Sequence, residues 1–415
     1  MPLSALTLAL LLATHPAQPA PPSSVPEAAP STAPIAAADG FWVRPGYEVS
    51  VAVETIPGAR FMEVDDHGVL YVSRPRPGDI IALRDADGDG VYEQRQTYTS
   101  GKPRLHGLCY SGGWLWFTTT GSIHKARDTD GDLIADEVVD VLAPGTLVTG
   151  GGHWWRSLLV TKDTLYTSIG DGGNISDQTD TDRQKIFSFA LDGSGKQLFA
   201  SGIRNTEKLR LRPGTSEIWG FDHGSDWFGR EAGDTEGDQP ITDLNPPEEL
   251  NLYTQSGFYG HPFIVGNRIP RYEYFKREGI HDLARSTIPP EWTMGAHWAP
   301  NGFCFIDPAL SGLPRGIPAG HAGDCFVACH GSWNSTEPVG YCIARVLFDK
   351  ETGKPYGLLK IVSTIEPETR AIKARPVDCV QAADGSLLFS SDQPGRIYRL
   401  RTTPSAASTG ASHQP

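Results

Sequence analysis

GSLLFSSDQPGRIYRL, residues 385–400, predicts two short strands joined by a turn that contains proline and glycine. The first strand and the turn before it recur in five more places along the chain. The other copies are GVLYVS, GWLWFT, DTLYTS, SEIWGF and GDCFVA, which begin at Gly68, Gly113, Asp163, Ser216 and Gly323. Because a strand pair cannot bury both of its faces alone, we expect the six copies to stack around a common core.

The spacing of the copies predicts an all-β fold, a six-bladed β-propeller. The first four copies begin about 45 to 53 residues apart, which suits a blade of four strands. The next gap is more than twice as long, so residues 230–300 are expected to hold insertions, which often carry function. GYEVSVAVE, which begins at Gly46, is a candidate for a strand that closes the ring. A β-sandwich is the alternative, but it does not require six similar units.

The composition is that of a globular, turn-rich chain. It contains 46 glycines and 33 prolines, and 39% of its residues are hydrophobic. The formal net charge is -13. Nucleic acids and anionic membrane surfaces are therefore not expected as partners, because both require a basic surface.

The two ends of the chain differ from its centre. The apolar run LSALTLALLLAT is too short to span a bilayer, so residues 1–20 are predicted to be a signal peptide. A spacer rich in Pro and Ala is expected over 21–38, the propeller domain over 39–401 and a disordered tail over 402–415. The mature protein is therefore predicted to be periplasmic or secreted, with no membrane span.

Six cysteines, five of them after residue 300, are compatible with one or more disulfides, and buried thiols are the alternative. The pairing stays open. Cys325 and Cys329 precede His330 in a pattern close to a covalent haem motif, but three residues separate the cysteines instead of two. The segment also matches a propeller strand, so haem is not expected.

Several longer segments occur in a characteristic order, each near the end of a predicted strand. They are HWWRSLLVTKDTLYTSIGDGGN from His153, GIRN, DLNPPEELN, SGFYGHP, HWAPNGFCF, HGSWN, PVGYCIARV and ARPVD. With the closing segment quoted above, they make the chain resemble the PQQ-dependent glucose/sorbosone dehydrogenases, from about Pro45 to Leu400. This resemblance implies a six-bladed propeller that holds pyrroloquinoline quinone (PQQ) and Ca²⁺. It also implies oxidation of a sugar or related alcohol, with electrons passed to an external acceptor such as a quinone, a cytochrome or a dye.

His153 and Arg204 are the candidate catalytic residues. A neutral imidazole can take the proton of a sugar hydroxyl while hydride leaves the same carbon, and His153 matches the family's catalytic histidine. Arg204 matches an arginine that contacts the quinone, where a guanidinium would stabilise negative charge on the reacting carbonyl. A histidine beside Trp154 and Trp155 can also be a packed, hydrogen-bonded residue without a catalytic role.

The resemblance supplies the remaining cofactor contacts. Asn205 follows Arg204 in the family's Arg-Asn pair, and Arg156 and Arg375 are candidates to bind the cofactor's carboxylates. Each of these two arginines can alternatively form an ordinary ion pair. At HGSWN, Trp333 can stack on a flat ring system or a sugar, and Asn334 can hydrogen-bond to either.

Two further residues are assigned to the substrate, and three positions depart from the family pattern. His297 and Tyr259 are the substrate candidates. Thr206 stands where a proline often follows the Arg-Asn pair, and Val377 where glucose dehydrogenases carry a second arginine. His261 replaces a usual tryptophan. Affinity for the cofactor, or its orientation, is therefore expected to differ.

The segment 243–251 resembles the family's calcium loop. Ca²⁺ prefers carbonyl and carboxylate oxygens, and a proline-rich loop presents carbonyls without competing N–H groups. Asn245 and Pro246 are the predicted donors, with Glu249 supporting the loop. A rigid turn without metal would have a similar sequence.

Two Asp-rich stretches, 85–90 and 128–132, place carboxylates at alternate positions, as calcium loops do. Neither has an acidic residue at the twelfth position, where Gln96 and Val139 stand. Both fall where a blade needs a tight turn, so structural turns are favoured.

The sequence therefore predicts a quinoprotein sugar dehydrogenase. Two alternatives remain: a propeller that only binds carbohydrate or protein, and a metal-dependent lactonase on the same fold. A lactonase requires side-chain Glu, Asn and Asp that converge on one metal, whereas the strand ends here offer His and Arg.

Overall fold

The computed structural model describes residues 38–229, 237–314 and 316–403. The predicted signal peptide, nearly all of the spacer and all but the first two residues of the tail lie outside these ranges. Among the described residues, no helix combines the length and the apolar character that crossing a bilayer requires.

Six sheets of four or five strands make up the body of the fold. From the inner strand outwards, blade 1 contains β3 (Met62–Val64), β4 (Leu70–Arg74), β5 (Asp79–Arg84) and β6 (Gln94–Thr99). Blade 2 contains β7 (Leu108–Ser111), β8 (Trp114–Thr118), β9 (Ile123–Arg127) and β10 (Glu137–Leu142). Blade 3 contains β11 (Leu159–Val160), β12 (Thr164–Ile169), β13 (Lys185–Ala190), β14 (Gln197–Ser201) and β18 (Gly257–Phe258).

The other three blades follow the same plan. Blade 4 contains β15 (Leu209–Leu211), β16 (Ile218–Asp222), β17 (Glu248–Tyr253) and β21 (Trp292–Met294). Blade 5 contains β22 (Pro300–Phe305), β23 (Cys325–Cys329), β24 (Cys342–Phe348), β25 (Pro355–Ser363) and β1 (Trp42–Val43). Blade 6 contains β26 (Pro376–Gln381), β27 (Leu387–Ser391), β28 (Arg396–Thr402) and β2 (Tyr47–Val53).

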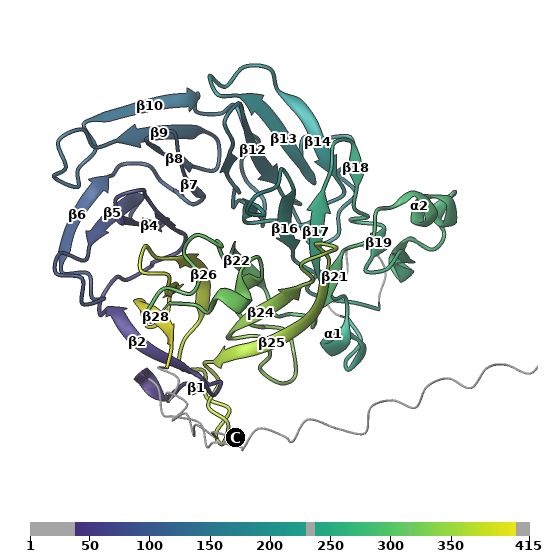
Figure 1. Ribbon diagram of the computed structural model, residues 1–415. Helices are drawn as coiled ribbons and strands as arrows, with labels where there is room; N and C mark the ends of the chain where they lie inside the picture. The colour runs from purple at the N-terminus through teal and green to yellow at the C-terminus, as the bar shows by residue number, and fades with distance from the viewer. Residues whose placement is uncertain (1–37, 230–236, 315, 404–415) are drawn as a thin grey trace, which may run out of the picture. The chain divides into compact units, whose positions relative to one another are not determined.

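The blades form a closed ring. The inner strands β3, β7, β11, β15, β22 and β26 contact one another in cyclic order, and β26 returns to β3 (Figure 1). Each of the six copies found in the sequence supplies the second strand of one blade: β4, β8, β12, β16, β23 and β27. The predicted six-bladed β-propeller is confirmed.

The predicted closing strand is also confirmed. GYEVSVAVE forms β2, which pairs antiparallel with β28, so that Tyr47 lies opposite Thr402. The preceding strand β1 pairs with β25 of blade 5, with Trp42 opposite Ser363. The start of the described chain therefore completes two neighbouring blades.

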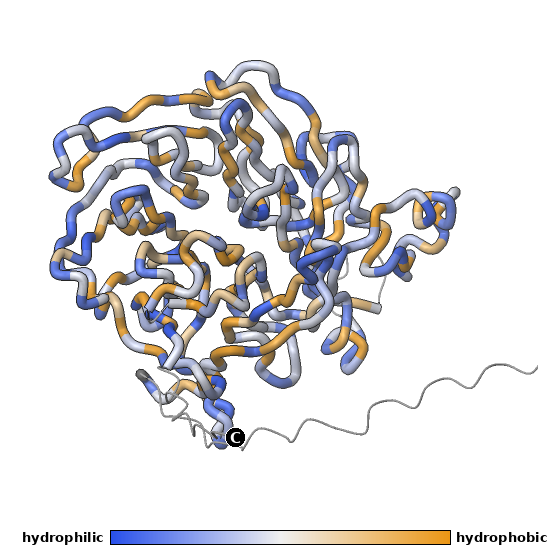
Figure 2. The backbone as a smooth tube through the Cα atoms, viewed as in Figure 1, coloured by the Kyte–Doolittle hydropathy of each residue, from blue (hydrophilic) through white to orange (hydrophobic). Residues whose placement is uncertain are grey.

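The hydrophobic core is divided between neighbouring blades. Six of the buried clusters each join residues of two adjacent blades, and together they run round the whole ring. Phe117 of β8, for example, belongs to the same buried cluster as Tyr71 of β4, and a fully buried side chain of this size contributes about 1.5–3 kcal/mol. Outer strands face solvent, as in β6, where four successive residues are exposed. Figure 2 shows hydrophobic residues along the strands and hydrophilic ones at many turns.

The predicted insertion lies in blade 4. It contains α1 (Ile241–Leu244), the hairpin β19 (Ile264–Val265) and β20 (Ile269–Pro270), and α2 (Ile280–Ser286), which project from one side of the ring (Figure 1). Short 3-10 helices occur at Ala38–Gly40, Tyr272–Tyr274 and Ala319–His321. The strand β18 leaves this insertion to pair in parallel with β14 of blade 3.

All six cysteines are buried free thiols in the structure, which therefore favours the second of the two alternatives drawn from the sequence. Cys329 lies directly opposite Cys342 across β23 and β24. Cys325 and Cys329 are fully buried within β23. A covalent haem cannot be attached there without opening blade 5.

Candidate functional site

An open cleft of about 700 Å³ lies at one end of the ring. It is formed by the segments that lead into the inner strands and by the segments that follow the second strands. Inner and second strands are antiparallel, so these segments share one end of the ring. Six of the residues singled out in the sequence line the cleft: His153, Arg204, His297, Trp333, Asn334 and Arg375.

His153 precedes β11 and is held in one tautomer. Its Nδ1 donates a hydrogen bond of 2.9 Å to the carbonyl oxygen of Asp171, because that oxygen can only accept. The other nitrogen, Nε2, is then unprotonated. Burial, followed by the nearby positive charge of Arg204, holds the pKa of His153 well below 6.5. The side chain is therefore neutral and carries a lone pair at neutral pH.

Arg204 lies beside His153, in the connection between β14 and β15. Its Nη1 donates to the carbonyl of Gly224 at 2.7 Å, and its Nη2 lies 3.2 Å from a carboxylate oxygen of Asp226. Its Nε and Nη2 also donate to the backbone and side-chain oxygens of Asn174. This set of acceptors fixes the guanidinium plane against one wall of the cleft.

A hydrogen-bonded arc joins Arg375 to Arg60 in the cleft. Arg375 Nη2 donates to His330 Nδ1 at 3.1 Å, so His330 Nε2 carries the proton and donates to Asp392 at 3.1 Å. Arg60 Nη1 lies 3.2 Å from the same Asp392 carboxylate, and its Nη2 lies 3.3 Å from Glu207. Burial lowers the pKa of His330 to about 4. Because both of its nitrogens are engaged, His330 orients Arg375 and is not free to act as a base.

Burial raises the pKa of both carboxyl groups in this arc, but their partners compensate to different extents. Burial opposes ionisation of Asp392, but the hydrogen bond from His330 and the two nearby arginines outweigh it and hold its pKa at about 2. Burial raises the pKa of Glu207, against the charge of Arg60. Asp392 therefore stays ionised at neutral pH.

The mouth of the cleft is aromatic. Trp333 follows β23 and is 68% exposed, and its ring lies 5.4 Å from that of Trp227 in an edge-to-face arrangement. An exposed tryptophan of this kind marks a surface that a ligand can cover. Asn334 is buried, and its carbonyl accepts a hydrogen bond from Gln239. His297 Nε2 donates to the carbonyl of Thr242 in α1.

The remaining predicted residues lie behind the cleft. Arg156 is fully buried and donates to four backbone carbonyls, those of Thr120, Val148, His153 and Trp155. Tyr259 is buried and donates to Leu252. Asn205 lies beneath the cleft, where its amide contacts Glu207 and His223. The cofactor and substrate roles of these residues stay predictions.

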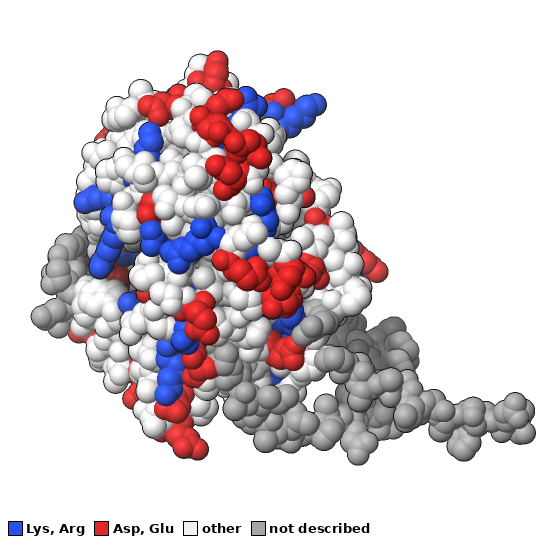
Figure 3. Space-filling model, turned by 90° about the vertical axis from the view of Figure 1, so that its left-hand side faces the viewer, with Lys and Arg blue, Asp and Glu red and all other residues white. Residues whose placement is uncertain are grey.

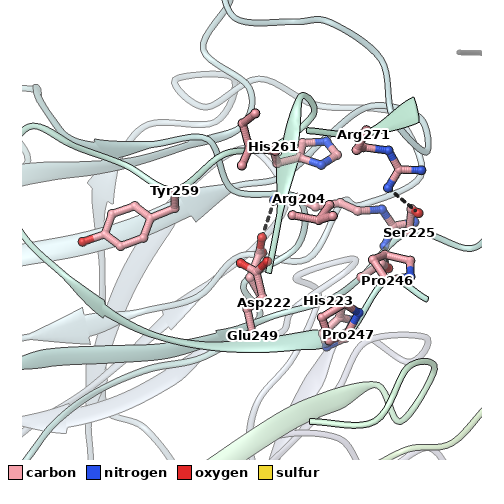
Figure 4. Close-up of a pocket in the computed structure, with 13 residues that line it drawn as sticks. Arg204, Asp222, His223, Ser225, Pro246, Pro247, Glu249, Tyr259, His261 and Arg271 are labelled. Carbon is pink, nitrogen blue, oxygen red and sulfur yellow. Dashed lines mark hydrogen bonds between the residues drawn. The ribbon is translucent and has the colours of Figure 1, made fainter. Parts of the chain in front are cut away.

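A second, smaller cavity lies on the other side of Arg204 (Figure 4). Its walls include the buried carboxyl groups of Asp222 and Glu249, and burial raises the pKa of Glu249 to about 8. The ring of His261 and the guanidinium of Arg271 are also drawn there. Arg204 and Gly224 line both cavities and form part of the wall between them.

The predicted calcium loop borders that wall. The carbonyl oxygens of Pro246 and Pro247 converge on Gly224, where an added Cβ would lie 2.9 Å from one and 3.1 Å from the other. A pair of carbonyls that converge in this way suits a hard cation. Asn245 does not line either cavity, and its amide nitrogen donates to Ile241 in α1. Glu249 instead accepts a hydrogen bond from the backbone of Gly266.

The unpaired polar atoms at the cleft are all donors. Arg60 Nε, Arg375 Nε and Asn334 Nδ2 are buried and have no hydrogen-bond partner among the described residues. Buried donors without partners are rare in folded proteins. Together with Arg204, they give the cleft the chemistry of a site for an anion rich in acceptor oxygens.

The three departures from the family pattern lie close to the cleft. Thr206 is buried, with its hydroxyl 3.0 Å from Asp222 and 2.8 Å from the Tyr253 hydroxyl. His261 donates to Asp171 at 2.7 Å and so braces the residue whose carbonyl orients His153. Val377 is fully buried within β26 and brings no charge.

Sequence reasoning missed several residues that line the cleft, among them Arg60, Trp155, Glu207, His223, Asp226, Glu248 and His330. Trp155 and His330 lie inside segments that were singled out for other residues. His223 and His330 could have been found in the sequence, because each directly follows the second strand of its blade, β16 or β23. Arg60 has no motif around it.

The Asp-rich stretches are turns in which carboxylates accept backbone N–H groups. Asp85 accepts from Gly88 and Gly90, and Asp128 accepts from Gly131 and Leu133. Each loop also has an acidic residue at its ninth position, Glu93 or Asp136, close to the other carboxylates. The sequence prediction considered only the twelfth position and missed these two residues. Figure 3 shows acidic side chains gathered in groups on the side where β6 and β10 lie in Figure 1.

A protein-family model described as TrAA12-like matches residues 41–403. An uncharacterised protein of Borreliella burgdorferi is 28% identical over 216 residues, which are 52% of this chain and 51% of that protein. A second one, from Synechocystis, is 24% identical over 335 residues, which are 72% of this chain and 69% of that protein. The chain thus matches about half the length of the first of these relatives.

Solved structures share the fold. The calcium structure of the Trichoderma reesei carbohydrate-active enzyme of family AA12 is 21% identical, with a TM-score of 0.74, 88% of this chain covered and 97% of that one. The holo form of the pyranose dehydrogenase PQQ domain from Coprinopsis cinerea is 19% identical, with a TM-score of 0.72 and coverages of 87% and 97%. The soluble aldose sugar dehydrogenase of Escherichia coli is 15% identical, with a TM-score of 0.58 and coverages of 86% and 99%.

Proposed function

The chain belongs to the TrAA12-like family, and from this we propose that it is a PQQ-dependent dehydrogenase that oxidises a sugar. The observation that carries the proposal is His153, neutral and with Nε2 unprotonated, in a cleft that also contains Arg60, Arg204 and Arg375. A base beside several fixed positive charges is what oxidation of a hydroxyl next to an anionic quinone requires.

The residues of the cleft fit such a cofactor. PQQ, when bound, supplies the electrophilic carbonyl carbon that accepts hydride. The buried donors without partners on Arg60, Arg375 and Asn334 are complementary to its carboxylate oxygens. Trp333 offers a face for stacking at the mouth. The carbonyls of Pro246 and Pro247 would hold Ca²⁺, and Asn245 stays a predicted donor.

The chemistry of the chain's own groups follows from their geometry. His153 Nε2 accepts the proton of the substrate hydroxyl as the C–H bond breaks, while its Nδ1–H stays bound to Asp171. Arg204, fixed by Gly224 and Asp226, would stabilise the negative charge that develops on the reacting carbonyl oxygen. The imidazolium formed at His153 is destabilised by burial, so it returns its proton readily.

The finer assignments rest on the resemblance. The substrate class is an aldose, a sorbosone-like sugar or a related alcohol or aldehyde, with His297 at its binding site. The electrons leave through an external acceptor, and the mature protein works in the periplasm or outside the cell.

The proposal is tested by adding PQQ and Ca²⁺ to the purified apoprotein. Binding is followed by the absorbance of the quinone, and turnover by reduction of an artificial dye with a panel of sugars. We expect dye reduction that depends on PQQ and on at least one sugar. A protein that binds sugars but neither binds PQQ nor reduces the dye is the non-catalytic alternative. Hydrolysis of lactones without PQQ would identify a lactonase.

A further inference from the structure

We propose that Cys329 and Cys342 form a disulfide that closes the loop carrying His330, Trp333 and Asn334 of the cleft. The two cysteines are the last residue of β23 and the first residue of β24, so the loop lies between them. All six cysteines are thiols in the structure. Among the strand pairings of the described residues, this one alone places two cysteines directly opposite each other.

The strand register brings the two side chains to the separation that a disulfide requires. Directly opposite residues of antiparallel strands have Cα atoms about 4.5–5.5 Å apart and point to the same face of the sheet. Disulfides bridge Cα atoms about 4.4–6.8 Å apart. Cys329 and Cys342 are fully buried members of one hydrophobic cluster. Burial raises the pKa of Cys329 well above its usual value, and contact with the Cys342 thiol adds to this shift.

The neighbouring cysteines lack this register. Cys325 lies four residues from Cys329 along the same strand, about 13 Å away, which is too far for a disulfide. Its own partner in β24 is Val346. Cys304 and Cys379 also touch, but they belong to the inner strands of different blades, where no shared register fixes their Cα separation. Cys329 and Cys342 are therefore the pair that the fold holds in place for oxidation.

The loop between the two cysteines is already narrow at its base. The backbone N–H of Ser332 donates to the carbonyl of Val339 at 3.2 Å, and the hydroxyl of Tyr341 donates to the carbonyl of Ser332. The disulfide lies next to these contacts and joins the two ends of the loop covalently. Such a link restricts the unfolded chain and opposes local opening of the loop. His330 and Trp333 are thereby kept in place at the cleft.

The oxidation is a thiol–disulfide exchange. The two thiols give up two protons and two electrons to an oxidant disulfide, small or carried by a protein, which is reduced to two thiols through a mixed disulfide. The attacking species is the thiolate, and burial disfavours the thiolate of Cys329 in the finished blade. The bond therefore forms during folding, before blade 5 closes, in a compartment that supplies disulfides.

The test maps the thiols of protein that is exported to the periplasm of a bacterial host and purified without reductant. Free thiols are blocked with iodoacetamide in denaturant before digestion with chymotrypsin. In this segment the protease cuts after four aromatic residues: Phe326, Trp333, Tyr341 and Phe348. The fragments 327–333 and 342–348 then carry one cysteine each. We expect mass spectrometry to find these two fragments joined, and dithiothreitol to separate them. Alkylated Cys329 and Cys342 in most of the protein would overturn the inference.

Two variants separate the effect of the link from the loss of a buried thiol. Cys342→Ala removes the partner, so Cys329 should be alkylated. Cys325→Ala is the matched control, because Cys325 is fully buried in the same strand and lies opposite Val346. We expect amide hydrogen exchange in residues 330–341 to be about tenfold faster in Cys342→Ala than in the control, and the melting temperature to be lower. Equal exchange and equal melting would show that no link holds the loop. None of these measurements uses PQQ, so they test this inference independently of the proposed function.

Discussion

The neutral His330, whose side chain is 14% exposed, should make the protein sensitive to acid, and the size of the effect follows from its surroundings. Burial lowers its pKa from 6.5 to about 4, so the unfolded chain binds a proton at a higher pH than the native state does. The free energy of unfolding therefore decreases as the pH falls below 6.5, until His330 is itself protonated in the native state near pH 4. Each pH unit below 6.5 lowers the free energy of unfolding by about 1.4 kcal/mol, so the loss at pH 5 is about 2 kcal/mol.

Substitution by glutamine isolates this contribution. Glutamine can accept from Arg375 and donate to Asp392, but it does not titrate. Urea unfolding at pH 7.5 and at pH 5 should show that the wild type loses about 2 kcal/mol more than His330→Gln. The matched control is His281→Gln, because His281 lies on the exposed side of α2 and its replacement should leave the pH dependence unchanged. Equal losses in the wild type and in His330→Gln would refute the reasoning.

Three other substitutions test the site. His153→Ala should lower kcat about 10²–10⁴-fold, because the positioned base is lost. The Kd for PQQ should stay within a few-fold of the wild type, because no cofactor contact is removed. Dye-linked rates measure kcat and dialysis measures Kd, and unchanged turnover would exclude His153 as the base. Thr206→Val removes the hydrogen bonds to Asp222 and to Tyr253 and should cost about 1–3 kcal/mol in urea unfolding. Burial opposes ionisation of Asp171, but His261 outweighs it and holds the pKa at about 2. Asp171→Asn should therefore lower stability by about 2 kcal/mol at pH 7, and a smaller difference is expected near pH 2, where about half of the wild-type carboxyl groups are protonated.

The fold was predictable because the signal repeats. The second strand of each blade is packed between neighbouring blades, so it is mostly buried and rich in apolar residues, as in β16, where all five residues are buried. That requirement recurs six times and stands out from the sequence. The outer strands, such as β6, face solvent and show no comparable pattern. The repeat therefore predicts the number of blades, and no comparable pattern marks their outer strands.

The site was predictable only where a motif marks it. His153, Arg204 and Trp333 lie in segments that resemble a family, and all three line one cleft. Arg60 comes from a segment without a motif, and its place in the cleft depends on pairing with carboxylates far away in the sequence. Arg156 shows the opposite case. It lies three residues from His153, but its side chain turns away from the cleft into backbone carbonyls.

The N-terminal strands have a consequence for how the ring is assembled. β1 and β2 are made early during synthesis, but their partners β25 and β28 are among the last strands to appear. Until then, β2 presents unpaired backbone groups along an edge that another chain could join. The final pairing links residues from opposite ends of the domain, so it is entropically costly and slow. A chain that begins after β2 would leave β28 as a permanent open edge, and we expect such a protein to associate through it.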